Sequence, residues 1–305
     1  MSEARTYQPG MGLEGKNVVV LGVADESSIA WGMVEAFVRH GARVRIGYQQ
    51  KFFSRVRLLL QRLPSVQGSR CDILKEDELT AFFSHFQQDP VDVLVHAIAF
   101  GPPEVFTEPA SGLSAQGFSQ TMAISAHSLG TVVRCVKPYL KDWGSIITVT
   151  FQASERAVPM YGTMGVAKSA LESLVRYLAL ELGRQKVRVN AISAGPIETV
   201  ASLGEALAFV RNPSALSVQR GRLFETAIRE ASQEISRDRF DYDVAMAKAV
   251  WSRVQKEFAS KCPIEEFVSK EDVADCALFL GSDYSKKITG QVIHVDCGLS
   301  SAMIM

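Results

Sequence analysis

The chain has 305 residues, of which 47% are hydrophobic and 22% charged, a composition typical of a folded globular protein with a substantial core. Lys plus Arg equals Asp plus Glu, 33 each, so overall charge favours neither nucleic acid nor an anionic membrane as a partner. The five cysteines and five histidines lack ligand spacing, so we expect no metal site and reduced thiols. The chain contains no signal peptide or membrane-spanning apolar run, and we expect a cytoplasmic protein.

The order of strand-like and helix-like apolar patterns along the chain predicts the fold. The first ten residues are polar, contain Pro9 and Gly10, and are expected to form a loose tail. After them, strands are predicted at 17–21, 43–48, 65–71, 91–97, 145–150, 187–192 and 291–295, and helices at 29–39, 52–62, 76–87, 115–140, 162–184 and 270–280. Strict alternation predicts an α/β, Rossmann-like, doubly wound parallel sheet of about seven strands with helices on both faces, in one domain spanning 1–305.

Residues 203–262 break this alternation. Apolar residues recur at helical spacing from Phe224 to Ile235 and again from Val244 to Phe258, which predicts two amphipathic helices with a break near 238–243. The segment follows the sixth strand, at the edge of an open α/β sheet where ligands bind. It is therefore either a lid over an apolar substrate or a structural flap.

The stretch LGVADESSIAWG, residues 21–32, links the first strand to the first helix. Gly22 permits a tight turn, and Ser28 can cap the helix whose N-terminus would attract a diphosphate. The pattern G-x-G-x-x-G is absent, so the stretch alone also fits an ordinary strand–turn–helix. Asp25 and Glu26 would repel a phosphate, and we expect both at the outer, solvated side of the turn.

Polar residues also follow the second and third strands. Gln49 stands where a dinucleotide-binding protein places the residue that meets the adenosine ribose. Asp72, at the end of the third strand, can accept a hydrogen bond from an adenine amino group. Three suitable strand ends in succession favour a nucleotide site over three unrelated loops.

Tyr161 and Lys168 are seven residues apart, which is two helical turns, and would lie on one face of a helix. A lysine ammonium near a tyrosine favours the phenolate and can hold ribose hydroxyls. Hydride transfer to an enone or ketone leaves negative charge on oxygen, which a tyrosine O–H can stabilise. Such a pair also occurs by chance, so the spacing indicates a catalytic pair only together with the surrounding motifs.

Those motifs resemble one family. In chain order they are G-x5-S-x-A-x-G from Gly22 to Gly32, Y-x6-K at Tyr161 and Lys168, VRVNAISAGPIETVA at 187–201, and GQVIHVD at 290–296. Together they resemble the divergent short-chain dehydrogenases/reductases called enoyl-acyl-carrier-protein reductases, from about Leu13 to Ser300 apart from the helical segment within 203–262. The common members of the superfamily have Y-x3-K, but Gly165 stands four residues after Tyr161, which argues against a ketoacyl reductase or alcohol dehydrogenase of that type.

The resemblance implies reduction of the trans-2 double bond of an enoyl thioester on acyl carrier protein, as the last reductive step of fatty-acid elongation. It implies Tyr161 at the enolate oxygen and Lys168 at the cofactor ribose, with Phe151 beside them in the catalytic site. The implied substrate-binding residues are Gly101, Phe151 and Tyr161. The implied cofactor-binding residues are Gly22, Ser28, Ile29, Gln49, Asp72, Ile73, Ile98, Lys168, Ile197, Thr199, Val200 and Ala201.

Gln49 bears on the choice of cofactor. A neutral amide cannot pair with a 2′-phosphate as arginine does, so NADH is expected, with NADPH as the second choice because Arg45 and Lys51 lie nearby. Phe151 stands where many family members have a second tyrosine. The chemistry therefore depends on Tyr161 alone among tyrosines.

Two alternatives remain open at this point. One is an enoyl-CoA reductase or another short-chain reductase, because the motifs do not separate coenzyme A from carrier protein. The other is a dinucleotide-binding sensor that has lost catalysis, against which the intact pair of Tyr161 and Lys168 argues. The resemblance also implies a homotetramer in which helices 115–140 and 162–184 pair across subunits.

Overall fold

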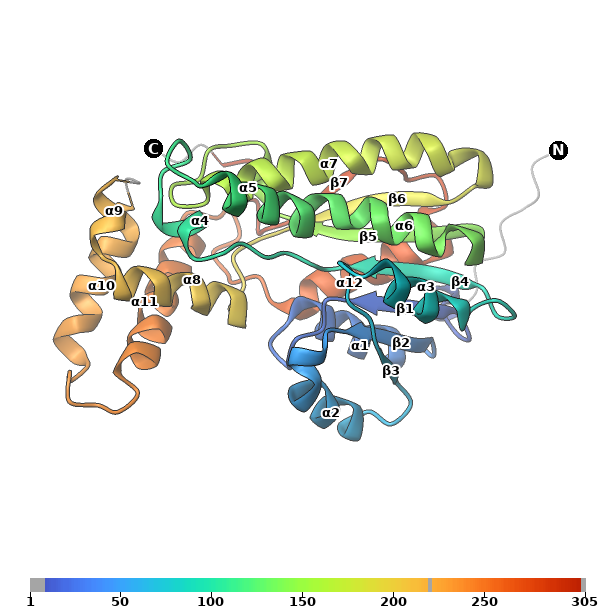
Figure 1. Cartoon of the computed structure of the whole chain (residues 1–305), viewed down its shortest axis with the longest axis horizontal. Coiled ribbons are helices and arrows are strands. Elements are labelled where there is room, and N and C mark those ends of the chain that lie inside the picture. The colour runs from blue at the N-terminus through green and yellow to red at the C-terminus, as the bar shows by residue number, and fades with distance from the viewer. Residues whose placement is uncertain (1–8, 219–220, 303–305) are drawn as a thin grey trace.

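A computed structural model describes residues 9–218 and 221–302, and its centre is a parallel sheet of seven strands (Figure 1). The strand order is β3-β2-β1-β4-β5-β6-β7, and every neighbouring pair is parallel. The strands are β1 (Asn17–Leu21), β2 (Arg43–Tyr48), β3 (Gln67–Arg70), β4 (Val91–His96), β5 (Leu140–Thr150), β6 (Arg188–Ala194) and β7 (Val292–Val295). This confirms the predicted Rossmann-like sheet. Its switch point, where such sheets bind ligands, lies between β1 and β4.

Helices cover both faces of the sheet. On β1, Val18 and Val20 pack into one core while Val19 and Leu21 pack into the other, because successive side chains of a strand point to opposite faces. The first core contains α1 (Ile29–Arg39), α2 (Phe53–Arg62) and α12 (Lys270–Gly281). The second contains α3 (Glu76–Ser84), α6 (Ser128–Val136) and α7 (Gly162–Leu182).

The predicted continuous helix 115–140 is wrong. The structure has α5 (Ala115–Met122), a π-helical turn (Ala123–His127), α6 and a 3-10 turn (Lys137–Tyr139), and β5 already begins at Leu140. At this interruption the helix contacts the loop after β4. The Ser125 hydroxyl accepts from the Phe100 backbone N–H and donates to the Phe100 carbonyl, both at 2.9 Å. Apolar periodicity continues through such a turn, so the sequence pattern did not reveal it.

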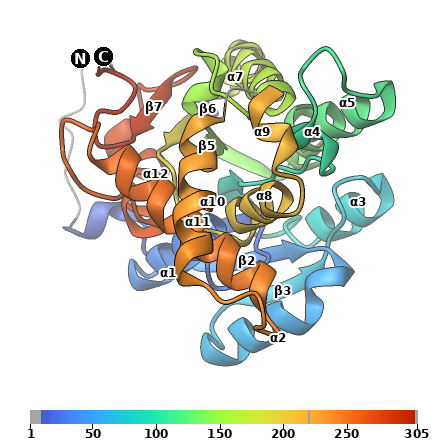
Figure 2. The same cartoon turned by 90° about the vertical axis from the view of Figure 1, so that its left-hand side faces the viewer.

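Among its described residues, the insertion after β6 contains four helices, where two were predicted. They are α8 (Val200–Arg211), α9 (Ser214–Val218), α10 (Arg222–Glu234) and α11 (Tyr242–Ala259). The last two confirm the predicted pair and the break between them. The insertion lies at the carboxyl end of the sheet (Figure 2) and packs around its own apolar cluster, which includes Phe209, Phe224 and Trp251.

The predicted loose tail at 1–10 falls mostly on residues 1–8, which lie outside the described residues. Pro9–Gly12 forms a 3-10 turn. Within the described part of the chain, none of the helices has the length and apolar character needed to cross a membrane.

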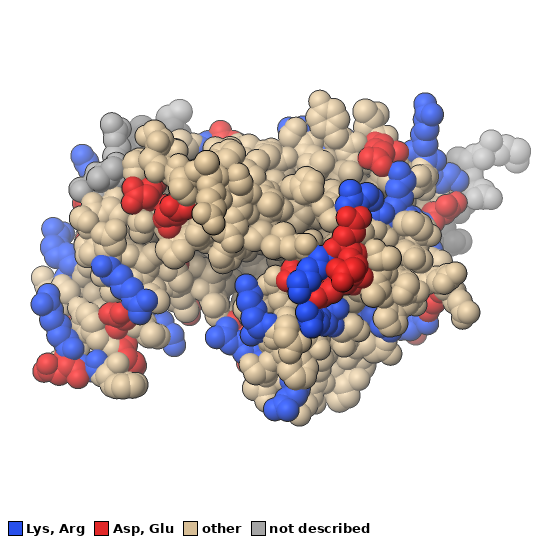
Figure 3. All heavy atoms as spheres, in the orientation of Figure 1, with Lys and Arg blue, Asp and Glu red and all other residues tan. Residues whose placement is uncertain are grey.

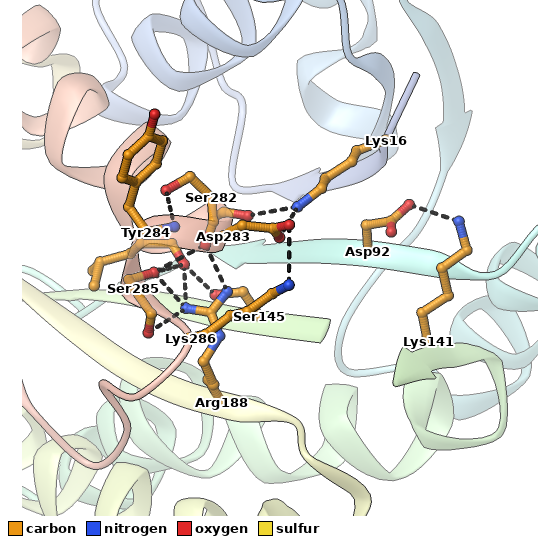
Figure 4. A network of polar contacts seen from close by, with 12 residues as sticks. Lys16, Asp92, Lys141, Ser145, Arg188, Ser282, Asp283, Tyr284, Ser285 and Lys286 are labelled. Atoms are coloured by element: carbon orange, nitrogen blue, oxygen red, sulfur yellow. Dashed lines mark hydrogen bonds and ion pairs between the residues drawn. The ribbon is translucent and has the colours of Figure 1, made fainter. Parts of the chain in front are cut away.

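A buried guanidinium ties the amino end of β6 to the carboxyl end of α12 (Figure 4). Arg188 donates to the Leu280 carbonyl at 2.6 Å, to the Ser285 hydroxyl at 2.6 Å and to the Ser282 carbonyl at 3.3 Å. Ser145 of β5 donates to the same Leu280 carbonyl at 2.8 Å. Around this centre, Lys16 and Lys286 flank Asp283 on the surface.

We predict that Arg188→Met lowers the free energy of unfolding by about 2–4 kcal/mol, because it leaves the buried carbonyls of Leu280 and Ser282 without their charged donor. Urea denaturation measures the change. Lys286→Met is the matched control: its ion pair with Asp283 is partly solvated and contributes at most about 1 kcal/mol. Equal losses in the two variants would contradict the prediction.

Candidate active site

The turn after β1 has the form expected of an anion-binding loop. Ser28 caps α1: its hydroxyl accepts from the Trp31 N–H at 3.3 Å and donates to the Asp25 carbonyl at 2.6 Å. Among the described residues, the backbone N–H groups of Ile29 and Ala30 have no partner. Free N–H groups at the positive end of a helix dipole suit a diphosphate.

Gly22 is required by a close approach between two strands. Its φ is +109°, and a Cβ there would lie 2.1 Å from the carbonyl oxygen of Ala97, the residue that follows β4. Gly32 lies against α12: a Cβ there would come within 3.0 Å of the Lys270 side chain. The Nζ of Lys270 in turn donates to the Glu26 carbonyl at 2.8 Å, so α12 supports this turn from behind.

The two acids of the turn face α2. Glu26 is 63% exposed and pairs with Arg62 at 2.8 Å, which confirms its predicted solvated position. Asp25 is only 16% exposed, so its predicted position is wrong; its carboxylate accepts from the Ser27 N–H and lies 3.6 Å from Arg55. Both charges are thus compensated by arginines of α2.

Gln49 and Asp72 meet each other at the ends of β2 and β3. The Asp72 Oδ1 accepts from Gln49 Nε2 at 3.0 Å and from the Leu74 N–H at 3.1 Å. Ile73 is 6% exposed and packs into the core beneath them, whereas Ile98, after β4, is half-buried.

A second helix N-terminus follows β6. Thr199 caps α8 in a reciprocal arrangement with Ser202. The exposed residues Val200 and Ala201 have backbone N–H groups without partners among the described residues, while Ile197 packs against the core. The donors at the starts of α1 and α8 fit the diphosphate and amide groups of a nicotinamide dinucleotide.

A stripe on α7 fixes that helix against the end of β5. The Lys168 ammonium donates to the Val149 carbonyl at 2.9 Å, the Ser169 hydroxyl donates to the Ser154 carbonyl at 2.6 Å, and Thr150 donates to the Glu172 carboxylate at 2.6 Å. One turn earlier, a Cβ on Gly165 would lie 2.8 Å from the Ala153 carbonyl. Since these positions follow helical spacing, they set the register of α7 and hence the place of Tyr161 at its start.

The Tyr161 ring lies between two phenylalanines. Phe151 meets it edge-on with the ring centroids 5.0 Å apart, and Phe106 of α4 (Glu104–Thr107) lies at 6.5 Å. Gly101 lies nearby, since a Cβ added to it would be 3.3 Å from the Met164 side chain of α7. Burial, with a contribution from the nearby Glu205 carboxylate, raises the pKa of Tyr161. Burial therefore opposes the phenolate that a nearby lysine would favour, and it supports the expected role of Tyr161 as an O–H donor.

Lys168 is 5% exposed, and burial lowers its pKa to about 8, against a smaller opposing effect of Glu172. Below it, His96 at the end of β4 contacts the hydroxyls of Thr148 and Ser128, and burial lowers its pKa to about 3, so it is neutral. The sequence reading missed His96, Ser125, Phe106 and Glu205. Each lies outside the motifs, and only the three-dimensional fold brings it to the site.

Comparison with known proteins identifies the family. The family model described as enoyl-(acyl carrier protein) reductase matches residues 22–218 and 241–300. The chain belongs to the enoyl-acyl-carrier-protein reductase family. Residues 219–240 lie outside this match, whereas the rest of the segment 203–262 lies within it.

Individual enoyl reductases are similar to this chain in sequence and structure over nearly its whole length. The enoyl-[acyl-carrier-protein] reductase [NADH] 1 of Rhizobium meliloti is 34% identical over 94% of this chain and 90% of its own length. The crystal structure of the NADH enzyme from Aquifex aeolicus superposes with a TM-score of 0.77 at 31% identity, covering 96% of this chain and 99% of that one. The reductase of Anaplasma phagocytophilum in complex with NAD has a TM-score of 0.76 at 28% identity, over 96% and 94% of the two chains.

Proposed function

We propose that this chain reduces the trans-2 double bond of an enoyl thioester on acyl carrier protein, with NADH as the reductant, in the last reductive step of fatty-acid elongation. The observation that carries the proposal is the placement of Tyr161. It is a neutral phenol at the start of α7, held by Phe151 and Phe106, on a helix whose Lys168 is fixed to β5.

The roles of the side chains follow from their chemistry. Bound NADH supplies the hydride that adds to C3 of the substrate. Negative charge then develops on the thioester oxygen, and the Tyr161 O–H stabilises it by a hydrogen bond. Transfer of a proton from solvent water to C2 would complete the saturated acyl thioester. Phe151 contributes an apolar ring and no hydrogen bond, so it holds the phenol in position without touching the charge.

Lys168 would hold the ribose next to the nicotinamide while it keeps its place on β5. The remaining cofactor contacts are proposed along the carboxyl edge of the sheet. Gly22, Ser28 and Ile29 would meet the diphosphate, Gln49, Asp72 and Ile73 the adenosine, Ile98 the inner ribose, and Ile197, Thr199, Val200 and Ala201 the nicotinamide side. Gly101 would line the substrate site beside Met164.

The homotetramer is part of the proposal, as is a location in the cytoplasm. Three apolar side chains of α7 are exposed, Val166 at 47%, Tyr177 at 69% and Leu180 at 77%. Figure 3 shows a broad surface with few charges over α5 and much of α7. Large apolar residues gathered on one helix face support an interface between copies of this chain.

We predict that NADH gives a kcat/KM roughly tenfold or more above that of NADPH, because Gln49 offers no charge to a 2′-phosphate. Oxidation of each cofactor is followed by absorbance with crotonyl-CoA and with a carrier-linked enoyl substrate. Preference for NADPH would overturn the cofactor assignment. NADH binding without turnover of either thioester would favour the sensor.

We predict that Tyr161→Phe lowers kcat by roughly a hundredfold or more and changes the Kd for NADH by less than about threefold, because only the oxyanion loses a donor. Steady-state kinetics and fluorescence titration of NADH measure the two effects. Tyr139→Phe, which removes a phenol in the 3-10 turn before β5 and outside the site, serves as the control. An unchanged kcat in Tyr161→Phe would show that the oxyanion role is misassigned.

We predict that sedimentation equilibrium gives four times the mass of the chain, and that Leu180→Asp dissociates the assembly by burying a charge in its interface. Leu58→Asp, at a 54% exposed position on α2, should leave the mass unchanged. A monomeric wild type would rule out the tetramer.

A further inference from the structure

One cation beside the proposed cofactor site has no carboxylate partner. Lys51 lies in the 3-10 turn that follows β2 (Gln50–Phe52), two residues after Gln49. Its ammonium is 5.0 Å from the ring centroid of Phe52 and 5.5 Å from that of Phe100, the fourth residue after β4. Within residues 9–218 and 221–302, Lys51 makes no hydrogen bond and no ion pair. Two aromatic faces therefore hold an ammonium whose N–H donors are available to a ligand.

The strand order places this contact across the cofactor loop. The two neighbours of β1 in the sheet are β2 and β4, so a side chain that reaches from the loop after β2 to the loop after β4 spans the end of β1. At that end, Gly22 begins the cofactor loop and lies against the backbone of Ala97. The Lys51 ammonium thus lies between the proposed adenosine contact, Gln49, and the loop proposed to meet the diphosphate.

The rings that hold the ammonium are themselves anchored. The backbone of Phe100 exchanges two hydrogen bonds of 2.9 Å with the Ser125 hydroxyl. Phe52 packs against the first core, and the next residue, Phe53, stacks on Tyr48 of β2 with the ring centroids 5.8 Å apart. The ammonium is therefore kept near the end of β1 even though the lysine is exposed.

Other cations around the site already have partners. Arg55 and Arg62 of α2 face Asp25 and Glu26, so the charges of the turn are compensated before any ligand binds. Two lysines donate to backbone carbonyls, Lys168 at the end of β5 and Lys270 at the turn itself. The N–H groups at the start of α1 offer a diphosphate only partial positive charge. Lys51, by contrast, brings a full positive charge that no carboxylate compensates.

We propose that Lys51 is a cofactor-binding residue whose ammonium pairs with the diphosphate of the dinucleotide. The inference rests on the proposed function, which supplies the nicotinamide dinucleotide. Lysine meets phosphate as a compact charge with rotatable donors, and leaving two exposed rings costs its ammonium little. Because NADH and NADPH share the diphosphate, this contact strengthens the binding of both and does not select between them.

The test measures the Kd of NADH, NADPH and ADP-ribose for wild type and Lys51→Met, by the fluorescence of the reduced cofactors and by displacement of NADH. We expect Lys51→Met to weaken all three by the same factor, roughly threefold to tenfold, since each carries the diphosphate. Lys51→Arg keeps the charge and should stay within about twofold of wild type. The control Lys75→Met should do so too, because its partner Glu78 also pairs with Arg70.

Ionic strength separates a charge contact from a structural role. The Kd of wild type for NADH should rise more steeply than that of Lys51→Met as NaCl increases from about 0.05 M to about 0.5 M, because screening weakens a contact that the variant lacks. The two constants should approach each other at the highest salt. A ratio that stays constant through the series would contradict the charge contact.

Three further results would overturn the inference and leave the proposed function intact. They are an unchanged Kd in Lys51→Met, a loss confined to NADPH, which would assign the ammonium to the 2′-phosphate, and a loss confined to the KM for crotonyl-CoA, which would assign it to a phosphate of the thioester carrier. If Lys51→Met does not fold, Lys51→Gln takes its place. Wild type that binds NADH but turns over neither crotonyl-CoA nor a carrier-linked substrate would overturn the proposed function and leave the inference standing.

Discussion

The seating of α7 on the end of β5 is the contact on which the whole site depends. A buried ammonium is unfavourable unless an acceptor replaces its water, and the Val149 carbonyl does this for Lys168. The same contact leaves no freedom for the helix to slide, because Gly165 touches the Ala153 carbonyl one turn before. The position of the Tyr161 phenol is therefore set by backbone groups at the end of β5 and in the turn that follows it.

Patterns that depend on neighbours in the chain were predictable. The runs at 17–21 and 43–48 became strands with the predicted bounds, and 29–39 became α1, because apolar periodicity and a capping serine determine these elements locally. The motif spacing likewise placed Lys168 on α7, with Tyr161 as the N-cap residue directly before the helix. Here the local signal and the fold agree.

Features that depend on distant neighbours were not predictable. The π-helical turn at 123–127 forms where Ser125 meets Phe100, and no periodicity shows that meeting. The raised pKa of Tyr161 arises from burial and from Glu205, both set by tertiary packing, so the spacing of Tyr161 and Lys168 in the sequence does not show it. In the insertion, α9 has only five residues, which is too few to show a helical repeat in the sequence.

The separate apolar cluster of the insertion has a consequence for how this chain can change. Phe209, Phe224 and Trp251 are buried against one another, whereas the sheet has its own cores on its two faces. Substitutions or altered length in 219–240, the part outside the family match, thus leave the packing of the sheet untouched. The insertion at the carboxyl end of the sheet and the framework of the sheet can therefore diverge at different rates, so the shape of this end of the molecule can change without a new fold.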